Sequence, residues 1–161
     1  MLAFLSRDFL FKTRKSANQT AKSDSTALDL RIKRMDSLYR IQKISLLKEE
    51  LTRLRKEEKE WSQGISSNKL AEIYDWLNEM YDLIEDVRNA RLYAKKALNV
   101  IDSTEQKYFY AITLNDYALA ESQLENYDKA IKIQFRALDF LGTDTLNSSY
   151  AYLTQNLGNN F

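Results

Sequence analysis

The C-terminal half of the chain repeats at an interval of forty residues, and this repeat restricts the possible folds more than any other feature. The alanines Ala90 and Ala97 recur as Ala130 and Ala137, and Tyr81 is followed at the same interval by Glu121 and Phe161. A fixed period of this length is typical of stacked units that bury their apolar faces only against a neighbouring unit. The sequence therefore predicts an array of helical repeats.

The composition favours helices throughout. The 161 residues include no proline and only three glycines, whereas β-rich folds use both residue types at their turns. Long stretches are rich in Leu, Ala, Lys, Glu and Arg, which are good helix formers. With 44% hydrophobic residues, the chain can bury one core. We predict an all-α fold.

Charge and hydropathy limit the partners. The 24 basic and 23 acidic residues give a net charge of +1, so no global field attracts nucleic acid or an anionic membrane. No apolar run approaches the roughly 18 residues that a transmembrane helix needs. The sequence has no cysteine, which fits a reducing compartment. We expect a cytoplasmic protein without a transmembrane segment.

Residues 1–26 combine scattered apolar side chains with basic residues and a polar run. We predict a flexible or loosely packed N-terminal arm that places its aromatic side chains on the rest of the protein. A basic amphipathic anchor at a membrane surface is an alternative, and docking to a partner is another.

Residues 27–62 have no glycine or proline, and their apolar residues recur at helical spacing. Two arrangements are compatible with this pattern. The segment is either one long amphipathic helix with a short coiled-coil seam at Leu47, Leu51, Leu54 and Trp61, or a degenerate hairpin. A hairpin would turn near Ser45–Leu46, forty residues before the next expected turn.

The clearest break in the chain covers residues 64–68, which include Gly64 and two serines. After it we predict helices over 69–84, 87–101, 105–124, 127–141 and 148–161. Ser103 or Thr104 would cap the third of these helices. Gly142 would end the fourth, because glycine accepts the left-handed conformation after a helix C-terminus.

These helices resemble the tetratricopeptide repeat (TPR), in which an aromatic residue, Leu-Gly and a second aromatic precede alanines on a second helix. The resemblance covers about 70–161 and implies antiparallel helical hairpins stacked as a right-handed superhelix, with the last repeat incomplete. The matching residues are Tyr74, Leu77, Tyr81, Ala90, Ala94, Ala97 and Leu98, then Leu114, Tyr117, Ala118, Ala130, Ala137 and Leu138, then the run Asn156-Leu157-Gly158-Asn159-Asn160-Phe161.

The sequence departs from the repeat pattern at three informative positions. Asn78 occupies the place of a small residue, and Glu121 and Gln134 stand where a large apolar residue is typical. The closing proline is missing, and the period is forty rather than about 34 residues.

Catalytic residue types are scarce. The chain has no histidine or cysteine, and its glycines are too scattered for a phosphate-binding loop. Glu72, Asp75, Glu79 and Asp82 share one side of a helix, where a solvated or partner-binding surface is a simpler interpretation than a hydrolytic or metal site. We expect no enzymatic activity, no cofactor and no metal.

The resemblance implies that the first helix of each repeat lines a concave groove that takes a peptide or a helix. Some family members clamp a terminal carboxylate with Lys, Arg and Asn, but this chain lacks the basic residues there. A groove that changes from acidic to amide side chains suits a basic or neutral segment. The matching positions are Glu72, Asp75, Trp76, Glu79, Asp82, Ile112, Asn115, Asp116, Leu119, Gln123, Tyr152, Gln155, Asn156 and Asn159.

The sequence therefore favours a non-catalytic scaffold or adaptor that binds another protein. Two alternatives remain open at this point. One is a structural subunit of a larger assembly or homo-oligomer, which would associate through its N-terminal helix and C-terminal end. The other is the TPR sensor region of a signalling or transcription regulator.

Overall fold

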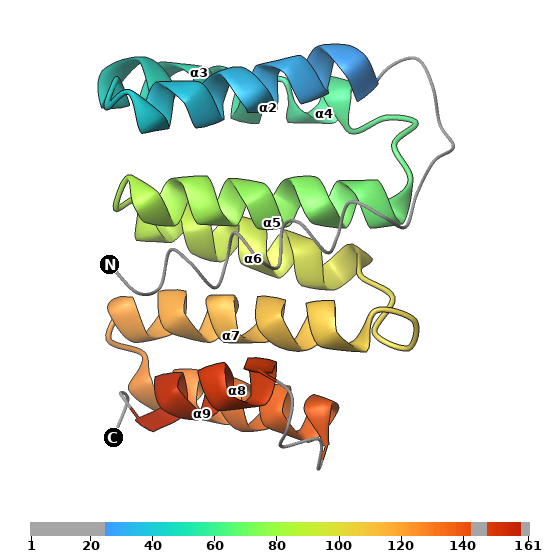
Figure 1. Ribbon diagram of the computed structural model, residues 1–161, viewed down its shortest axis with the longest axis vertical. Coiled ribbons are helices and arrows are strands. Elements are labelled where there is room, and N and C mark those ends of the chain that lie inside the picture. The colour runs from blue at the N-terminus through green and yellow to red at the C-terminus, as the bar shows by residue number, and fades with distance from the viewer. Residues whose placement is uncertain (1–24, 143–147, 159–161) are drawn as a thin grey trace. The chain divides into compact units, whose positions relative to one another are not determined.

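The computed structural model describes residues 25–142 and 148–158, and every regular element in them is a helix (Figure 1). The prediction of an all-α fold is confirmed. Within the same residues, no helix has both the length and the apolar character needed to cross a lipid bilayer. The chain divides into two compact units, Met1–Lys43 and Ile44–Phe161.

The first unit contains α2, and the second contains the remaining helices. The bounds are α2 Ser25–Arg40, α3 Ile44–Lys56, α4 Glu58–Trp61, α5 Ser67–Leu83, α6 Val87–Val100, α7 Lys107–Gln123, α8 Tyr127–Leu141 and α9 Ser148–Gly158.

The segment 27–62 is not one continuous helix. Helix α2 ends at Arg40 and α3 begins at Ile44, so the break lies a few residues before the turn expected at Ser45–Leu46. It is produced by Gln42, whose φ of 58° is in the left-handed region. A left-handed residue ends the helical hydrogen-bond ladder, and the apolar spacing on either side does not reveal it.

The same kind of turn follows α2, α5 and α7. Gln42, Glu85 and Glu125 have φ angles of 58°, 62° and 64°. In each turn the N–H of this residue bonds to the carbonyl three residues earlier, and the next N–H bonds to the carbonyl five residues before it. This is the Schellman pattern, which satisfies carbonyls that the helix end would leave unpaired. The repeat in the sequence is thus a repeat of turn geometry as well as of apolar residues.

The other helix ends agree with the sequence in most places. Ser66 caps α5 by accepting a hydrogen bond from the N–H of Lys69, and Gly142 ends α8 with a φ of 68°, as predicted. The prediction that Ser103 or Thr104 caps α7 is wrong. Helix α7 begins at Lys107, and the loop before it is closed by Asp102, whose Oδ1 accepts the N–H of Thr104 at 2.9 Å.

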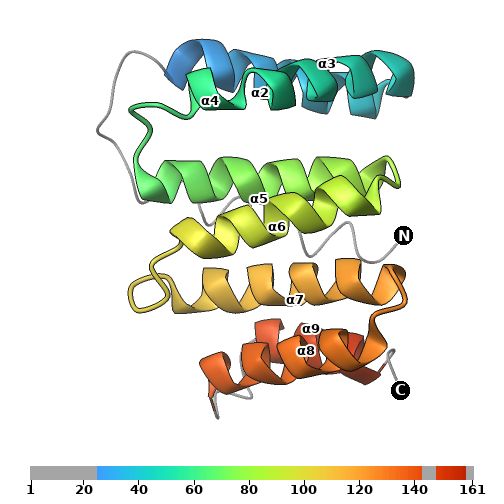
Figure 2. The same ribbon diagram turned by 180° about the vertical axis from the view of Figure 1, so that it is seen from behind.

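The helices of the second unit pack in pairs and then in series. Helix α5 packs on α6 and α7 packs on α8, while α6 contacts α7, and α9 contacts both α8 and α7. Figure 1 views the unit from the side of α5, α7 and α9, and Figure 2 views it from the side of α6 and α8. We call α5, α7 and α9 the first helices and α6 and α8 the second helices. The alanines of the repeat lie where these helices meet, and each is at most 1% exposed: Ala90, Ala97, Ala118, Ala130 and Ala137.

Helix α4 is attached to α6 through a partly buried polar cluster with aromatic walls. Glu58 accepts hydrogen bonds from Lys96 Nζ at 2.5 Å and from the Tyr93 hydroxyl at 3.2 Å. The Tyr93 ring stacks on the Tyr81 ring with 5.4 Å between centroids, and the Tyr81 hydroxyl donates to the carbonyl of Leu51 on α3. Burial raises the pKa of Tyr81 to about 12, so this hydroxyl remains a donor.

The left-handed turn residues give the first test. Glu125 is exposed and has a φ of 64°, a conformation that a side chain disfavours and that glycine accepts freely. We expect Glu125→Gly to raise the free energy of unfolding by about 0.5–1 kcal/mol, measured by urea denaturation. As a control, Lys132→Gly in the exposed middle of α8 should lower it by about 1 kcal/mol. Equal losses for both variants would contradict the left-handed turn.

Candidate protein-binding surface

The candidate surface is the side of the first helices that carries the residues predicted to bind a partner. On α5, four carboxylates follow one another at helical spacing, Glu72, Asp75, Glu79 and Asp82, and all four are half-buried. Because i, i+3 and i+7 positions fall on one side of a helix, these carboxylates form a continuous acidic strip.

Hydrogen bonds join this acidic strip to the next first helix. The Thr113 hydroxyl shares its one proton between the carbonyl of Phe109, at 2.9 Å, and Asp75 Oδ1, at 3.3 Å. Gln123 Nε2 donates to Asp82 Oδ1 at 3.2 Å. The partners on the two helices are 38 and 41 residues apart. The repeat therefore brings Asp75 and Asp82 of α5 beside Thr113 and Gln123 of α7, through side chains on the same face.

A matching bond joins α7 to α9. Asn156 Nδ2 donates to Asn115 Oδ1 at 3.3 Å, again across 41 residues. Asn115 is fully buried and Asn156 is half-buried. The three bonds form a series in which each first helix is connected to the next.

The remaining predicted residues divide by their exposure. Trp76 is only 4% exposed and, like Asn115, belongs to the core more than to the surface. Asp116 and Leu119 are half-buried on α7, and Gln123 is exposed. The side chain of Tyr152 and all of Asn159 lie outside the residues that the structure describes.

The charge of the surface changes from acidic on α5 to neutral on α9. Helix α5 carries four acidic residues and one lysine, whereas the sequence of α9 has no charged residue. Between them, α7 contributes Asp116 to the surface. In the part of the chain that the structure describes, no group of three or more acidic side chains is arranged to hold a metal ion. The carboxylates therefore form a strip along the helix and are not gathered around a point.

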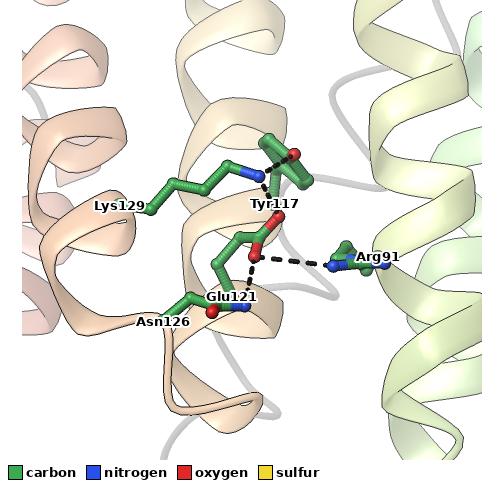
Figure 3. Close-up of polar contacts among 5 residues, drawn as sticks. All are labelled: Arg91, Tyr117, Glu121, Asn126 and Lys129. Carbon is green, nitrogen blue, oxygen red and sulfur yellow. Dashed lines mark hydrogen bonds and ion pairs between the residues drawn. The ribbon is translucent and has the colours of Figure 1, made fainter.

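Glu121 has a role that sequence reasoning missed. It is fully buried where the resemblance predicts an apolar residue, and Figure 3 shows it between α6 and α8. Lys129 Nζ donates to its Oε1 at 2.6 Å, Asn126 Nδ2 donates to its Oε2 at 2.8 Å, and Arg91 Nη1 lies 3.7 Å from Oε2. One carboxylate thus links three helices and the turn between two of them.

The electrostatics of this cluster favour the charged form of Glu121. Burial by itself raises the pKa of Glu121, but hydrogen bonds from Lys129, Tyr117 and Asn126 outweigh it and hold the pKa below its usual value. The pKa of Lys129 is raised, chiefly by its hydrogen bond to Glu121. Glu121 and Lys129 are eight residues apart and lie on α7 and α8. The turn between these two helices is the only sequence feature that could have indicated the pair.

Comparison with known proteins finds no match: no protein-family model matches the chain, and no curated protein or solved structure gives a significant match.

The Glu121 cluster gives the second test. We expect Glu121→Gln to lower the free energy of unfolding by about 2 kcal/mol, because it weakens charge-assisted hydrogen bonds in a buried place. Because the folded-state pKa of Glu121 is depressed, its contribution is present above the unfolded-state pKa of about 4.3 and is lost as the pH falls through the folded-state value.

Urea denaturation at a series of pH values would measure this. The wild type should lose stability on acidification more steeply than Glu121→Gln, so the two curves should converge at low pH. Glu125→Gln, at an exposed neighbouring carboxylate, is the matched control and should leave the curve unchanged. A constant difference between wild type and Glu121→Gln at every pH would contradict the ion cluster.

Proposed function

We propose that this protein is a non-catalytic interaction scaffold of the tetratricopeptide-repeat type, which holds a peptide or helix of another protein against its first helices. The observation that carries the proposal is the series of hydrogen bonds between successive first helices. Asp75 with Thr113, Asp82 with Gln123, and Asn115 with Asn156 connect positions 38 to 41 residues apart. Helices held side by side in this way offer an extended surface on which a partner could lie.

Three further observations support the repeat type. The turns after α5 and α7 share one backbone geometry. The alanines expected to lie between helices are all buried. The departure at Asn78 has a local explanation, since its Nδ2 donates to the carbonyl of Ala90 and thereby pairs a polar group that stands in place of a small residue. A stacked, right-handed superhelix of hairpins is the arrangement that we infer from these features.

The partner segment is expected to be basic or neutral. A cationic portion would lie along α5, where the carboxylates gather, and a neutral portion would lie along α9, where polar amides prevail. Buried Trp76 and Asn115 would support the surface from below, while Asp116, Leu119 and Gln123 would contact the partner. We expect the protein to be cytoplasmic and to need no cofactor.

Charge reversal on α5 tests the proposal. We expect the double variant Asp75→Lys with Glu79→Lys to abolish capture of the native partner in crosslinking and pull-down experiments, because it replaces two carboxylates of the strip by cations. The matched control is Glu105→Lys with Glu125→Lys, which makes the same charge change at exposed sites away from the strip. Circular dichroism melting would verify that both variants fold. Unchanged capture by the α5 variant would disprove the surface.

A second candidate function, a structural subunit of an assembly, is favoured by exposed aromatic side chains on α8. Tyr127 and Phe135 are 53% and 48% exposed, although both are large. Such side chains are common where a protein meets another chain. If they mediate self-association, Phe135→Glu should shift the sedimentation profile toward the monomer at high concentration, whereas Lys132→Glu should not. A monomeric wild type at every concentration would count against this function.

A further inference from the structure

The two helices of the first hairpin carry opposite charge. Helix α5 is acidic, whereas α6 has four basic residues and no acidic residue: Arg88, Arg91, Lys95 and Lys96. The chain as a whole is almost neutral, so this asymmetry is local. It places a basic surface on the side of the second helices, which Figure 2 faces.

Two of these four cations form ion pairs with carboxylates of the same chain. Arg91 lies 3.7 Å from the buried carboxylate of Glu121, and Lys96 bonds to Glu58 at 2.5 Å. Arg88 and Lys95 are instead exposed. They are seven residues apart, which is two helical turns or about 10.5 Å along the axis. Leu92 lies between them on the same side of the helix and is half-buried.

A hollow adjoins the N-terminal end of α6. It is open to solvent, and its volume is about 520 Å³. Ile84, Val87 and Leu124 give it apolar walls, and Lys48 of α3 and Arg88 of α6 contribute cations to it.

Two carboxylates also line this hollow, Glu85 and Asp86. Asp86 is the N-cap of α6. It accepts hydrogen bonds from the backbone N–H of Asn89 at 3.3 Å and from Nδ2 of the same residue at 2.7 Å. Glu85 is exposed in the left-handed turn. The carboxylate that can be changed without removing a cap is therefore Glu85.

We propose that the outer face of α6, with the hollow at its end, binds an acidic helical segment of a partner protein that carries an apolar side chain. Carboxylates two turns apart on the partner would meet Arg88 and Lys95, and its apolar side chain would enter the hollow between Lys48 and Arg88. A nucleic acid fits less well, because its phosphates are regularly spaced and would meet Glu85 and Asp86, whereas a helix can place its carboxylates at Arg88 and Lys95 and an apolar side chain at the hollow. This surface lies on the side opposite the first helices and does not depend on the function proposed above.

The test uses a synthetic amphipathic helix with glutamates seven residues apart and a leucine at one end, labelled for fluorescence anisotropy and titrated with the full-length chain at low ionic strength. The structure predicts saturable binding that weakens as salt is added. Arg88→Glu with Lys95→Glu should weaken binding by about tenfold or more. Glu85→Lys should strengthen it severalfold, since it adds a cation beside the hollow.

Two controls separate this surface from general charge effects. Lys107→Glu with Lys132→Glu makes the same charge change on α7 and α8 and should leave the affinity unchanged. A probe with serine in place of leucine should bind more weakly to the wild type, because the hollow would lose its apolar occupant. Absence of binding, equal binding by the α6 double variant, or tighter binding of duplex DNA at the same residues would overturn the proposal.

Discussion

The close approach of helices at alanine positions is the constraint on which the second unit depends. Ala90 and Ala97 on α6, and Ala130 and Ala137 on α8, are at most 1% exposed. A larger side chain at any of these positions would push two helices apart, because interiors are packed as densely as crystals and have no space to yield. The forty-residue period marks the positions at which the backbones of two helices lie close together. The larger apolar residues between the alanines fill the remaining space.

Two polar side chains in this packed interior have hydrogen-bond partners on neighbouring helices. Asn78 occupies a small-residue position and gives its amide to the carbonyl of Ala90. Glu121 occupies an apolar position and is surrounded by donors from α6, α8 and the turn between α7 and α8. A buried group of this kind costs several kcal/mol when left unpaired. Such pairs therefore favour one arrangement of the hairpins over others that a purely apolar core would tolerate.

The consequence for function is a molecule with two chemically distinct sides. The first helices present carboxylates and amides, and the second helix of the first hairpin presents exposed cations and a hollow. Both surfaces belong to helices that pack together at buried alanines. Because the two surfaces carry opposite charge, they would select different partners.

Much of the fold could be predicted from residue pattern alone. The helices over 69–84, 87–101 and 127–141 end within two residues of the observed bounds, because apolar period, glycine and capping residues are local signals. The helix break was expected near Ser45–Leu46 but lies at Gln42, since glutamine and glutamate give little warning of a left-handed turn. The start of α7 was predicted to within two residues, but its cap was not, because Asp102 closes the loop in place of Ser103 or Thr104.

The candidate surface was predictable only in outline. Sequence spacing placed four carboxylates on one side of a helix, because residues three, four and seven positions apart lie on the same side. They are Glu72, Asp75, Glu79 and Asp82. Sequence spacing could not reveal that Thr113 and Gln123 would meet Asp75 and Asp82, since those contacts depend on how two helices pack. The same holds for Glu121 with Arg91, where burial and pairing arise from three helices at once. The local sequence thus determined where the helices form and which residues share one side of each helix. The distances between those sides were decided by how the helices pack.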